Sequence, residues 1–130
     1  MEGLIIVDTC ALLDFLAGMD KDNMVGRVLN QGKAAVSVIT VFELFRGVDI
    51  PKYLTLRDDL IHLCAILDLT EPICRKASEI YTSLKKRGEL ISNEDILIAA
   101  TAIHWKCSLL TFNKKYFQRI HSLEIFPLKQ

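Results

Sequence analysis

Residues 4–9 read Leu-Ile-Ile-Val-Asp-Thr, a short continuous apolar run that stops at an acid and a hydroxyl residue. Continuous runs rich in β-branched residues are typical of strands covered on both faces, as in a parallel sheet. Apolar residues then recur at helical spacing from Leu12 to Leu16, and Gly18 marks the end of that pattern. The stretch therefore predicts a buried strand that leads directly into a helix capped by Asp8 or Thr9.

Outward from this stretch, strand-like and helix-like segments alternate along the chain. Further strands are predicted at 34–39, 64–69, 108–111 and 123–126. Helices are predicted at 22–30, 40–47, 52–63, 72–87, 96–105 and 114–120. This alternation predicts a single α/β domain over residues 1–130, with a mostly parallel sheet.

The composition is that of a globular protein, since 51% of the 130 residues are hydrophobic and 25% are charged. Sixteen basic residues balance sixteen acidic ones, and this zero net charge argues against a protein that coats nucleic acid non-specifically. It leaves room for an acidic metal site offset by a basic rim. No apolar run approaches the roughly 18 residues of a membrane span, and no signal peptide opens the chain. We therefore expect a soluble, cytoplasmic protein with no membrane partner.

The four cysteines are Cys10, Cys64, Cys74 and Cys107. None forms a C-x-x-C pair, and no histidine stands beside them at the spacing of a zinc site. We expect them to be small buried residues in a reducing compartment.

Three acids fall at or near the carboxyl ends of predicted strands, where open α/β sheets place their working sites. Asp8 directly follows the first strand, Glu43 lies early in the helix after the second, and Asp95 opens the helix that leads to the fourth. Carboxylates brought together beside apolar sequence are costly and raise one another's pKa values. Mg²⁺ or Mn²⁺ relieves both costs, and either ion can activate a water against a phosphodiester. The three acids therefore predict a metal-dependent hydrolytic site.

Each acid also has a purely structural alternative. Asp8 can be only a helix cap, Glu43 can pair with Arg46 at i,i+3, and Asp95 can be a favourable acid in a first helical turn. Spacing by itself leaves these alternatives open.

Four stretches of the chain resemble, in order, the successive motifs of the PIN-domain family. They are IIVDTCALL at 5–13, TVFELFRGV at 40–48, EDILIAATA at 94–102 and LLTFNKKYF at 109–117. The resemblance spans nearly the whole chain, and within the family the chain is most similar to VapC-type toxins.

This resemblance implies a PIN-like domain, a parallel sheet of about five strands with helices on both faces. It implies an endoribonuclease that depends on Mg²⁺ or Mn²⁺ and is the toxin of a type II toxin–antitoxin pair. Its partners would be an RNA substrate, an antitoxin protein that blocks the site, and a second copy in a homodimer. Asp8, Glu43 and Asp95 match the three successive family acids, so the resemblance makes them the catalytic and metal-binding residues.

The resemblance also marks secondary site residues and one departure. Thr9 matches the small hydroxyl residue after the first acid, and Thr111 and Asn113 belong to the fourth motif. Near this fourth motif the family often has a further acid, but Tyr116 stands there in this chain. The departure puts a second metal in doubt. Glu94 is a weak candidate to compensate, because neighbouring helix residues do not share a face.

Several basic residues are candidates for RNA contact, because Lys and Arg bind phosphates. Arg46 matches a basic residue that often follows the second family acid. Lys114 and Lys115 follow a predicted strand end beside Asn113, whereas the run 85–87 reads as a solvated helix end.

Apolar residues crowd one short region, at Phe42, Phe45, Val48, Ile50 and Tyr53. One helix face need not bury so many, so we expect part of this region to contact an antitoxin segment or a second copy.

Three other functions compete with a nuclease. A haloacid-dehalogenase-like phosphatase needs a second Asp two residues after Asp8, and that residue is Cys10. A response-regulator receiver needs an acidic pair near the end of the first strand. The serious alternative is a non-catalytic PIN-like scaffold that binds RNA or a protein, and the missing fourth acid favours it.

Overall fold

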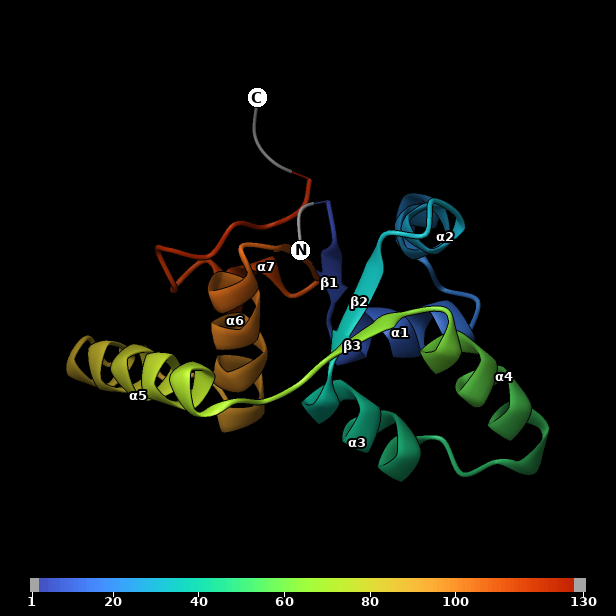
Figure 1. Ribbon diagram of the computed structural model, residues 1–130, viewed down its shortest axis with the longest axis horizontal. Helices are drawn as coiled ribbons and strands as arrows, with labels where there is room; N and C mark the ends of the chain where they lie inside the picture. The colour runs from blue at the N-terminus through green and yellow to red at the C-terminus, as the bar shows by residue number, and fades with distance from the viewer. Residues whose placement is uncertain (1–2, 128–130) are drawn as a thin grey trace.

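A four-stranded parallel sheet lies at the centre of the protein, whose computed structural model describes residues 3–127 (Figure 1). The strands are β1 (Ile5–Val7), β2 (Ala34–Ser37), β3 (Ala65–Leu67) and β4 (Ser108–Leu110). Their order across the sheet is β3-β2-β1-β4, and every neighbouring pair is parallel. The prediction of one α/β domain built on a parallel sheet is confirmed, although the sheet has four strands rather than about five.

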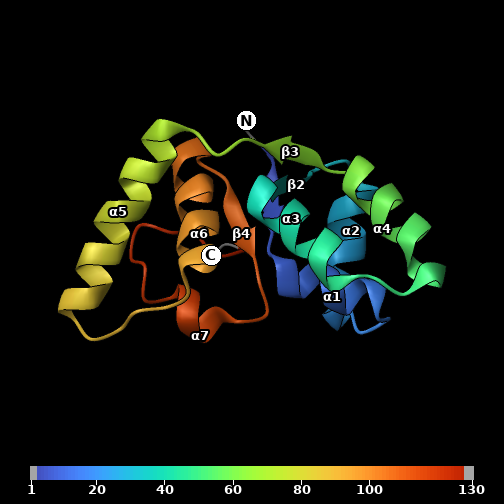
Figure 2. The same cartoon turned by 90° about the horizontal axis from the view of Figure 1, so that it is seen from below.

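Two helices connect each strand to the next in sequence, and a short one follows β4. They are α1 (Thr9–Leu16), the 3₁₀ turn η1 (Lys21–Asn23) with α2 (Met24–Asn30), α3 (Val38–Gly47), α4 (Pro51–His62), α5 (Glu71–Lys86), α6 (Asn93–Trp105) and α7 (Lys114–Phe117). The helices cover both faces of the sheet, as Figures 1 and 2 show. Parallel strands need such crossover connections because a tight turn cannot join them.

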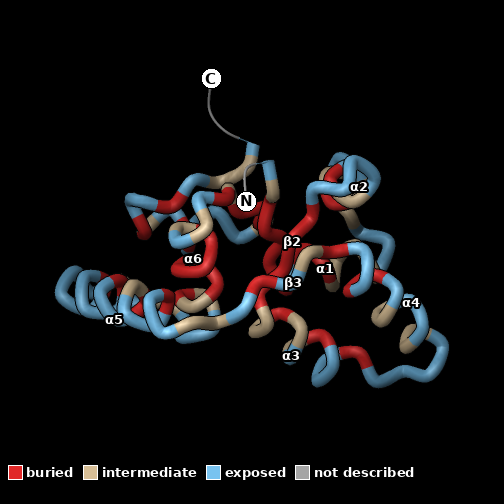
Figure 3. The backbone as a smooth tube through the Cα atoms, in the orientation of Figure 1, coloured by how far each residue is buried: buried red, intermediate tan, exposed pale blue. Residues whose placement is uncertain are grey.

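The central strands are buried because their residues pack alternately against two helical layers, whereas Ile66 of the edge strand β3 is exposed. Ile6, Ala35 and Leu109 pack with residues of α5 and α6, among them Ile80 and Ala99. Alternate strand residues, including Ile5, Val36 and Leu110, pack with residues of α1, α2 and α4. The buried stretches in Figure 3 accordingly follow the strands and α6, while the outer turns of α5 and α4 are exposed. This double burial explains why the strands read as continuous apolar runs.

The predicted fifth strand at 123–126 is reduced to a single bridge. Leu109 pairs there with Ile125, its amide donates to the Glu124 carbonyl, and its carbonyl accepts from the Phe126 amide. Pro127 follows and has no N–H to continue a ladder, so the pairing stops after one residue.

Some predicted boundaries shift by a few residues. β2 ends at Ser37 rather than at residue 39, because the Ser37 hydroxyl accepts a hydrogen bond of 3.1 Å from the Ile39 amide and starts α3. The predicted helix at 22–30 begins with η1, where Asp22 and Asn23 have positive φ, and the predicted helix at 114–120 ends at Phe117.

The cysteine prediction is half wrong. Cys64 and Cys107 are buried, but Cys10 and Cys74 are exposed, because they lie on the outward sides of α1 and α5. Among the described residues, no helix is both long and apolar enough to cross a membrane.

Candidate metal centre

The strand order reverses at β1, and this reversal locates the candidate site. β2 and β3 lie on one side of β1, whereas the chain crosses back to place β4 on the other side. In open α/β sheets, ligands bind outside the carboxyl ends of strands at such a switch point. Asp8 directly follows β1 and Thr111 directly follows β4, and the Asp8 amide donates to the Leu110 carbonyl at 3.1 Å.

Asp8 is 2% exposed, and each of its carboxylate oxygens accepts a hydrogen bond. Oδ1 accepts from the Ala11 amide at 2.8 Å and caps α1, so the structural role considered for Asp8 is real. Oδ2 accepts from the Thr111 hydroxyl at 2.5 Å. One carboxylate thus joins the start of α1 to the end of β4.

Burial raises the pKa of Asp8 from 3.8 to about 6. The hydrogen bonds from Thr111 and Ala11 oppose this rise, and the negative charges of Asp95 and Asp14 add to it. The site therefore disfavours a bare negative charge on Asp8 and would gain from a bound cation.

Asp95 lies half-buried in the first turn of α6, where the Ser92 hydroxyl caps its amide at 3.1 Å. Its pKa is raised, first by burial and then by the negative charges of Glu43 and Glu94, against the effect of the Ser92 hydrogen bond. Asp95 thus interacts electrostatically both with Asp8 and with Glu43, so the three acids border a common region.

Glu43 lies on α3 and is held from two sides. Its Oε1 accepts a hydrogen bond of 2.7 Å from the Thr9 hydroxyl, which also lies 3.0 Å from the Thr40 hydroxyl. Its Oε2 lies 3.5 Å from Arg46, so the considered i,i+3 pair exists as well. Thr9 therefore connects the first acid motif to the second through Glu43.

The three acids do not form a ready ion cage. Within residues 3–127, no three Asp, Glu, His or Cys side chains lie close enough together to hold a metal. Acids that raise one another's pKa values are expected to stay apart without a cation between them. The donor set nevertheless fits Mg²⁺ or Mn²⁺, since Mg²⁺ keeps several waters and often takes only one or two carboxylates.

The secondary candidates differ in their distance from Asp8. The main-chain amide of Asn113 donates to the Thr111 hydroxyl at 2.9 Å, so the backbone of Asn113 lies beside the threonine that binds Asp8, while its side chain is exposed. Tyr116 is exposed, and its ring lies 5.1 Å from the Arg119 guanidinium. Glu94 is exposed at the start of α6, and Lys114 and Lys115 are exposed on α7.

Two polar residues of this region were missed from the sequence. Asp14 contributes charge near Asp8 and Cys10, and Thr40 contacts Thr9. The signal was helical spacing: Asp14 stands four residues after Cys10 on α1, and Thr40 stands three before Glu43 on α3, so each pair shares a helix face.

Comparison with known proteins identifies the family to which the chain belongs. The PIN domain family model matches residues 5–123. The chain is 37% identical over 119 residues to Ribonuclease VapC1 of Methanocaldococcus jannaschii, an alignment that covers 92% of this chain and 82% of that one. It is also 37% identical over 104 residues to Ribonuclease VapC1 of Rickettsia felis, covering 75% and 78% of the two chains.

Solved structures agree in fold. VapBC-1 from nontypeable Haemophilus influenzae matches with a TM-score of 0.78 and 28% identity, over 94% of this chain and 96% of that one. VapBC2 from Rickettsia felis, bound to a DNA fragment from its promoter, matches with a TM-score of 0.80 over the same shares, and its 22% identity makes it evidence of fold alone. The described fold, the motifs and the family match together show that this chain belongs to the PIN-domain family.

Proposed function

We propose that this protein is a Mg²⁺- or Mn²⁺-dependent endoribonuclease and the toxin of a type II toxin–antitoxin pair. The observation that carries the proposal is the buried carboxylate of Asp8, which lies at the switch point of the sheet with its pKa raised to about 6. A carboxylate kept where its charge is costly indicates a role that needs that charge, and a cation supplies the compensation. The relatives named as VapC ribonucleases support the same activity.

Asp8, Glu43 and Asp95 would hold the ion through their carboxylate oxygens. An ion held there would supply an activated water and stabilise negative charge on the phosphodiester. Thr111 and Thr9 act on the acids themselves: the first fixes Oδ2 of Asp8, and the second fixes Oε1 of Glu43. Such hydrogen bonds to ligating carboxylates orient them toward the ion.

RNA would approach across the exposed cations near these acids. Arg46 pairs loosely with Glu43 at 3.5 Å and is exposed, so its guanidinium keeps donors for a phosphate. Lys114 and Lys115 open α7 directly after Asn113, and both are exposed. These residues neutralise the substrate backbone and bring it over the acids.

Metal titration combined with RNA cleavage tests the proposal. Calorimetry should detect Mn²⁺ binding to the wild type, and a fluorescent RNA should be cut in Mn²⁺ or Mg²⁺ but not in excess chelator. Asp8→Asn should lose both properties, while Asp59→Asn, an exposed acid on α4, should keep both. Cleavage that persists in excess chelator would overturn the metal-dependent mechanism. RNA binding without metal binding or cleavage would favour the non-catalytic scaffold.

The antitoxin would dock on the apolar region predicted from the sequence. Phe42, Phe45 and Ile50 are 61%, 51% and 53% exposed, whereas Val48 is buried and Tyr53 is half-buried. An open cavity of about 180 Å³ adjoins them, lined mainly by apolar residues of α1 and of the segment between α3 and α4. Exposed apolar surface beside such a cavity suits an apolar segment of a partner protein. Similar solved structures are VapBC assemblies.

Light scattering separates an antitoxin from a second copy at this face. If the wild type alone is monomeric at high concentration, the face stays open for the antitoxin. If it is a dimer that Phe42→Ser dissociates and Tyr81→Ser does not, the face belongs to the homodimer. Tyr81 is a matched control, because it is an exposed aromatic residue on α5.

A further inference from the structure

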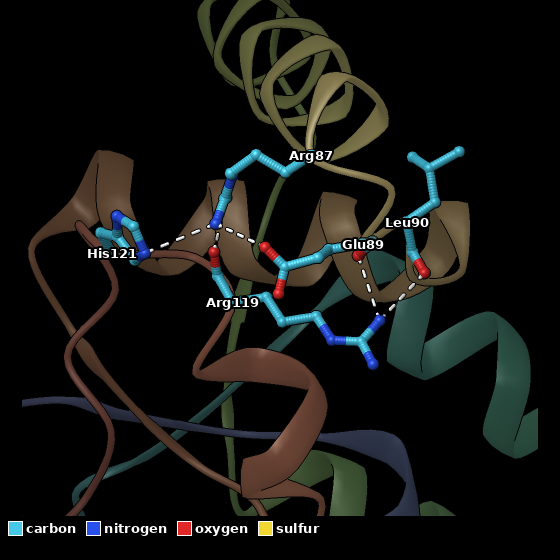
Figure 4. Close-up of polar contacts among 5 residues, drawn as sticks. All are labelled: Arg87, Glu89, Leu90, Arg119 and His121. Carbon is cyan, nitrogen blue, oxygen red and sulfur yellow. Dashed lines mark hydrogen bonds and ion pairs between the residues drawn. The ribbon is translucent and has the colours of Figure 1, made fainter.

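Arg87 and Arg119 form a clasp between two segments of the chain. One segment leads into Asp95, and the other contains Thr111, which binds Asp8. The connector between α5 and α6, residues 87–92, leads directly into the first turn of α6 and therefore into Asp95. On the other side, the chain from Thr111 through α7 reaches Arg119. Arg87 and Arg119 connect the two segments across 32 residues of sequence, as Figure 4 shows.

Arg119 holds the connector by its main chain. Its Nη1 donates to the carbonyls of Glu89 and Leu90, at 3.1 and 3.3 Å. The two carbonyls follow the turn at Gly88, where φ is +67° and the helical hydrogen bonds of α5 have ended. Carbonyls beyond a helix end need such donors, and one guanidinium here supplies both.

Arg87 holds Arg119 in return. Its Nη2 donates to the Arg119 carbonyl at 2.8 Å, and its Nη1 donates to Oε1 of Glu89 at 2.9 Å. The same Nη1 lies 3.4 Å from Nε2 of His121. Because a planar guanidinium presents donors in fixed directions, Arg87 fixes the main chain after α7 and the connector in one geometry.

Apolar packing fixes the inner side of this junction, where Ile80, Leu84 and Ile120 are buried, but it leaves the outer side open. An open cavity of about 260 Å³ lies between α5 and residues 120–122, and Arg87, Ile120 and His121 line it together with Lys76 and Ile80. The outer side lacks the close packing of a protein interior, so polar contacts there add to what holds the two segments together. On this open side, the hydrogen bonds of the clasp therefore help to fix the position of the connector relative to the end of α7.

The two joined segments also carry opposing acids. The segment after β4 fixes Asp8 through Thr111, and the connector delivers Asp95 through its Ser92 cap. The clasp lies at the far ends of these two segments, where the Arg119 guanidinium holds the Glu89 and Leu90 carbonyls and Arg87 holds the Arg119 carbonyl. It therefore ties the segment that leads into Asp95 to the segment that fixes Asp8.

We propose that Arg87 and Arg119 are positioning residues of the acid site, which set the place of Asp95 relative to Asp8 through the main chain of the connector. This inference rests on the proposed metal-dependent function. Neither arginine is assigned contact with metal or RNA. Their role is to keep two carboxylates of the metal site in register before an ion binds.

Amide hydrogen exchange and calorimetric Mn²⁺ titration test the clasp. In the metal-free protein, Arg119→Ala should speed exchange at Asp95 and Ile96 and weaken Mn²⁺ binding by about tenfold, the usual effect of removing a residue that orients metal ligands. At saturating Mn²⁺ the KM for RNA should stay close to wild type, because no RNA contact has been removed. Arg75→Ala is the matched control, since Arg75 is exposed on α5 and pairs only locally, with Glu71.

Arg87→Ala gives a second test. It keeps the hydrogen bonds from Arg119 to the connector carbonyls but removes the hydrogen bond from Arg87 that holds the Arg119 main chain. The double variant should be no worse than the more affected single variant, since the two arginines act as one unit. Exchange and Mn²⁺ affinity in Arg119→Ala that match Arg75→Ala would overturn the proposal, and so would fully additive effects in the double variant. A wild type that neither binds Mn²⁺ nor cuts RNA would contradict the proposed function instead, and the exchange comparison at Asp95 would still decide whether the clasp positions it.

Discussion

The Thr111 hydroxyl donates a hydrogen bond of 2.5 Å to Oδ2 of Asp8, across 103 residues of sequence. The same hydroxyl oxygen accepts from the Asn113 amide at 2.9 Å, so its one proton is directed to the carboxylate. Because Oδ1 of Asp8 caps α1, the carboxylate cannot turn to follow an ion without losing one of these bonds. Asp8 is therefore oriented before any cation arrives.

Thr111→Val should weaken metal binding while the fold is kept. The substitution preserves shape but removes a bond that lowers the pKa of Asp8, so that pKa should rise further. We expect a loss of about 1–2 kcal/mol in the free energy of unfolding, and Mn²⁺ affinity lower by about tenfold in calorimetry. Thr101→Val is the control, because Thr101 is equally buried but donates only to the Leu97 carbonyl of its own helix. Equal effects of the two substitutions on Mn²⁺ affinity would contradict the positioning of Asp8 by Thr111.

Asp8→Asn should stabilise the metal-free protein, and the gain should depend on pH. The pKa of Asp8 is raised from 3.8 to about 6 in the folded state, so its contribution to stability is present below 3.8 and is lost as the pH rises through 6. A shift of this size corresponds to about 3 kcal/mol at most, whereas Asn keeps the helix cap and does not titrate. In urea unfolding with chelator, Asp8→Asn should therefore have a higher free energy of unfolding than wild type near neutral pH. This difference should shrink toward about pH 4. Saturating Mn²⁺ should reverse the order, because only the wild type gains from the ion. A constant difference at all pH values would show that Asp8 is not the strained acid described here.

The sequence predicted the layout of the fold because its strands are buried on both faces. The continuous apolar runs at Ile5–Val7 and Ala34–Ser37 have no solvent-facing residues, so their assignment as parallel strands needed no knowledge of their neighbours. The stretch at 123–126, in which Glu124 stands among apolar residues, was wrongly predicted to be a full strand. Whether such a stretch forms a ladder depends on how its path lies beside β4, and that path is a tertiary property.

The sequence predicted which residues belong to the candidate site, but not which contacts they make with one another. Asp8, Glu43 and Asp95 were predicted from their positions at strand ends and from the family motifs, and their role as metal ligands stays a prediction. Which hydroxyl orients which carboxylate could not be predicted, because Thr9 and Glu43 meet across 34 residues and Thr111 and Asp8 across 103. The structural alternatives for Asp8 and Glu43 are both present, since one oxygen of each acid makes the cap or ion pair and the other accepts from a threonine.

Lys114 and Lys115 should contribute to RNA binding through charge. Replacing both with Ala should raise the KM for RNA. It should also reduce the slope of the logarithm of the binding constant against the logarithm of salt concentration by roughly one to two, since each phosphate contact releases about one counterion. Both residues are exposed on α7, so the fold and Mn²⁺ affinity should not change. Fluorescence anisotropy with a labelled RNA at several salt concentrations measures this slope. Replacing Lys85 and Lys86 at the end of α5 gives the matched control, and an equal loss of slope there would show that binding follows net charge rather than position.

Asn113→Asp should restore a fourth acid more effectively than Tyr116→Asp. In the resembled family an acid often stands where Tyr116 lies, but Asn113 is nearer to Asp8 along the contacts, because its main-chain amide donates to the Thr111 hydroxyl that binds Asp8. Tyr116 lies against the Arg119 guanidinium at 5.1 Å, so an acid there would pair with Arg119 at i,i+3 and be largely neutralised. We therefore expect tighter Mn²⁺ binding for Asn113→Asp and little change, or a loss, for Tyr116→Asp.

Asn113→Asp should also lower the free energy of unfolding of the metal-free protein, and this loss would show that the new carboxylate lies near Asp8. An acid at residue 113, beside the threonine that binds Asp8, should raise the pKa of Asp8 further. Asn113→Asp should therefore destabilise the metal-free protein near neutral pH, by about 0.5 kcal/mol, because the side chain of residue 113 is exposed and its charge is screened. Gln118→Glu adds the same charge just beyond α7 and is the control, since Gln118 is exposed and follows the helix end. Urea unfolding in chelator and calorimetric Mn²⁺ titration measure the two effects on one sample. If Asn113→Asp gains Mn²⁺ affinity without losing metal-free stability, its carboxylate does not adjoin Asp8. If Tyr116→Asp gains more affinity than Asn113→Asp, then α7 and not the Thr111 turn presents the fourth ligand.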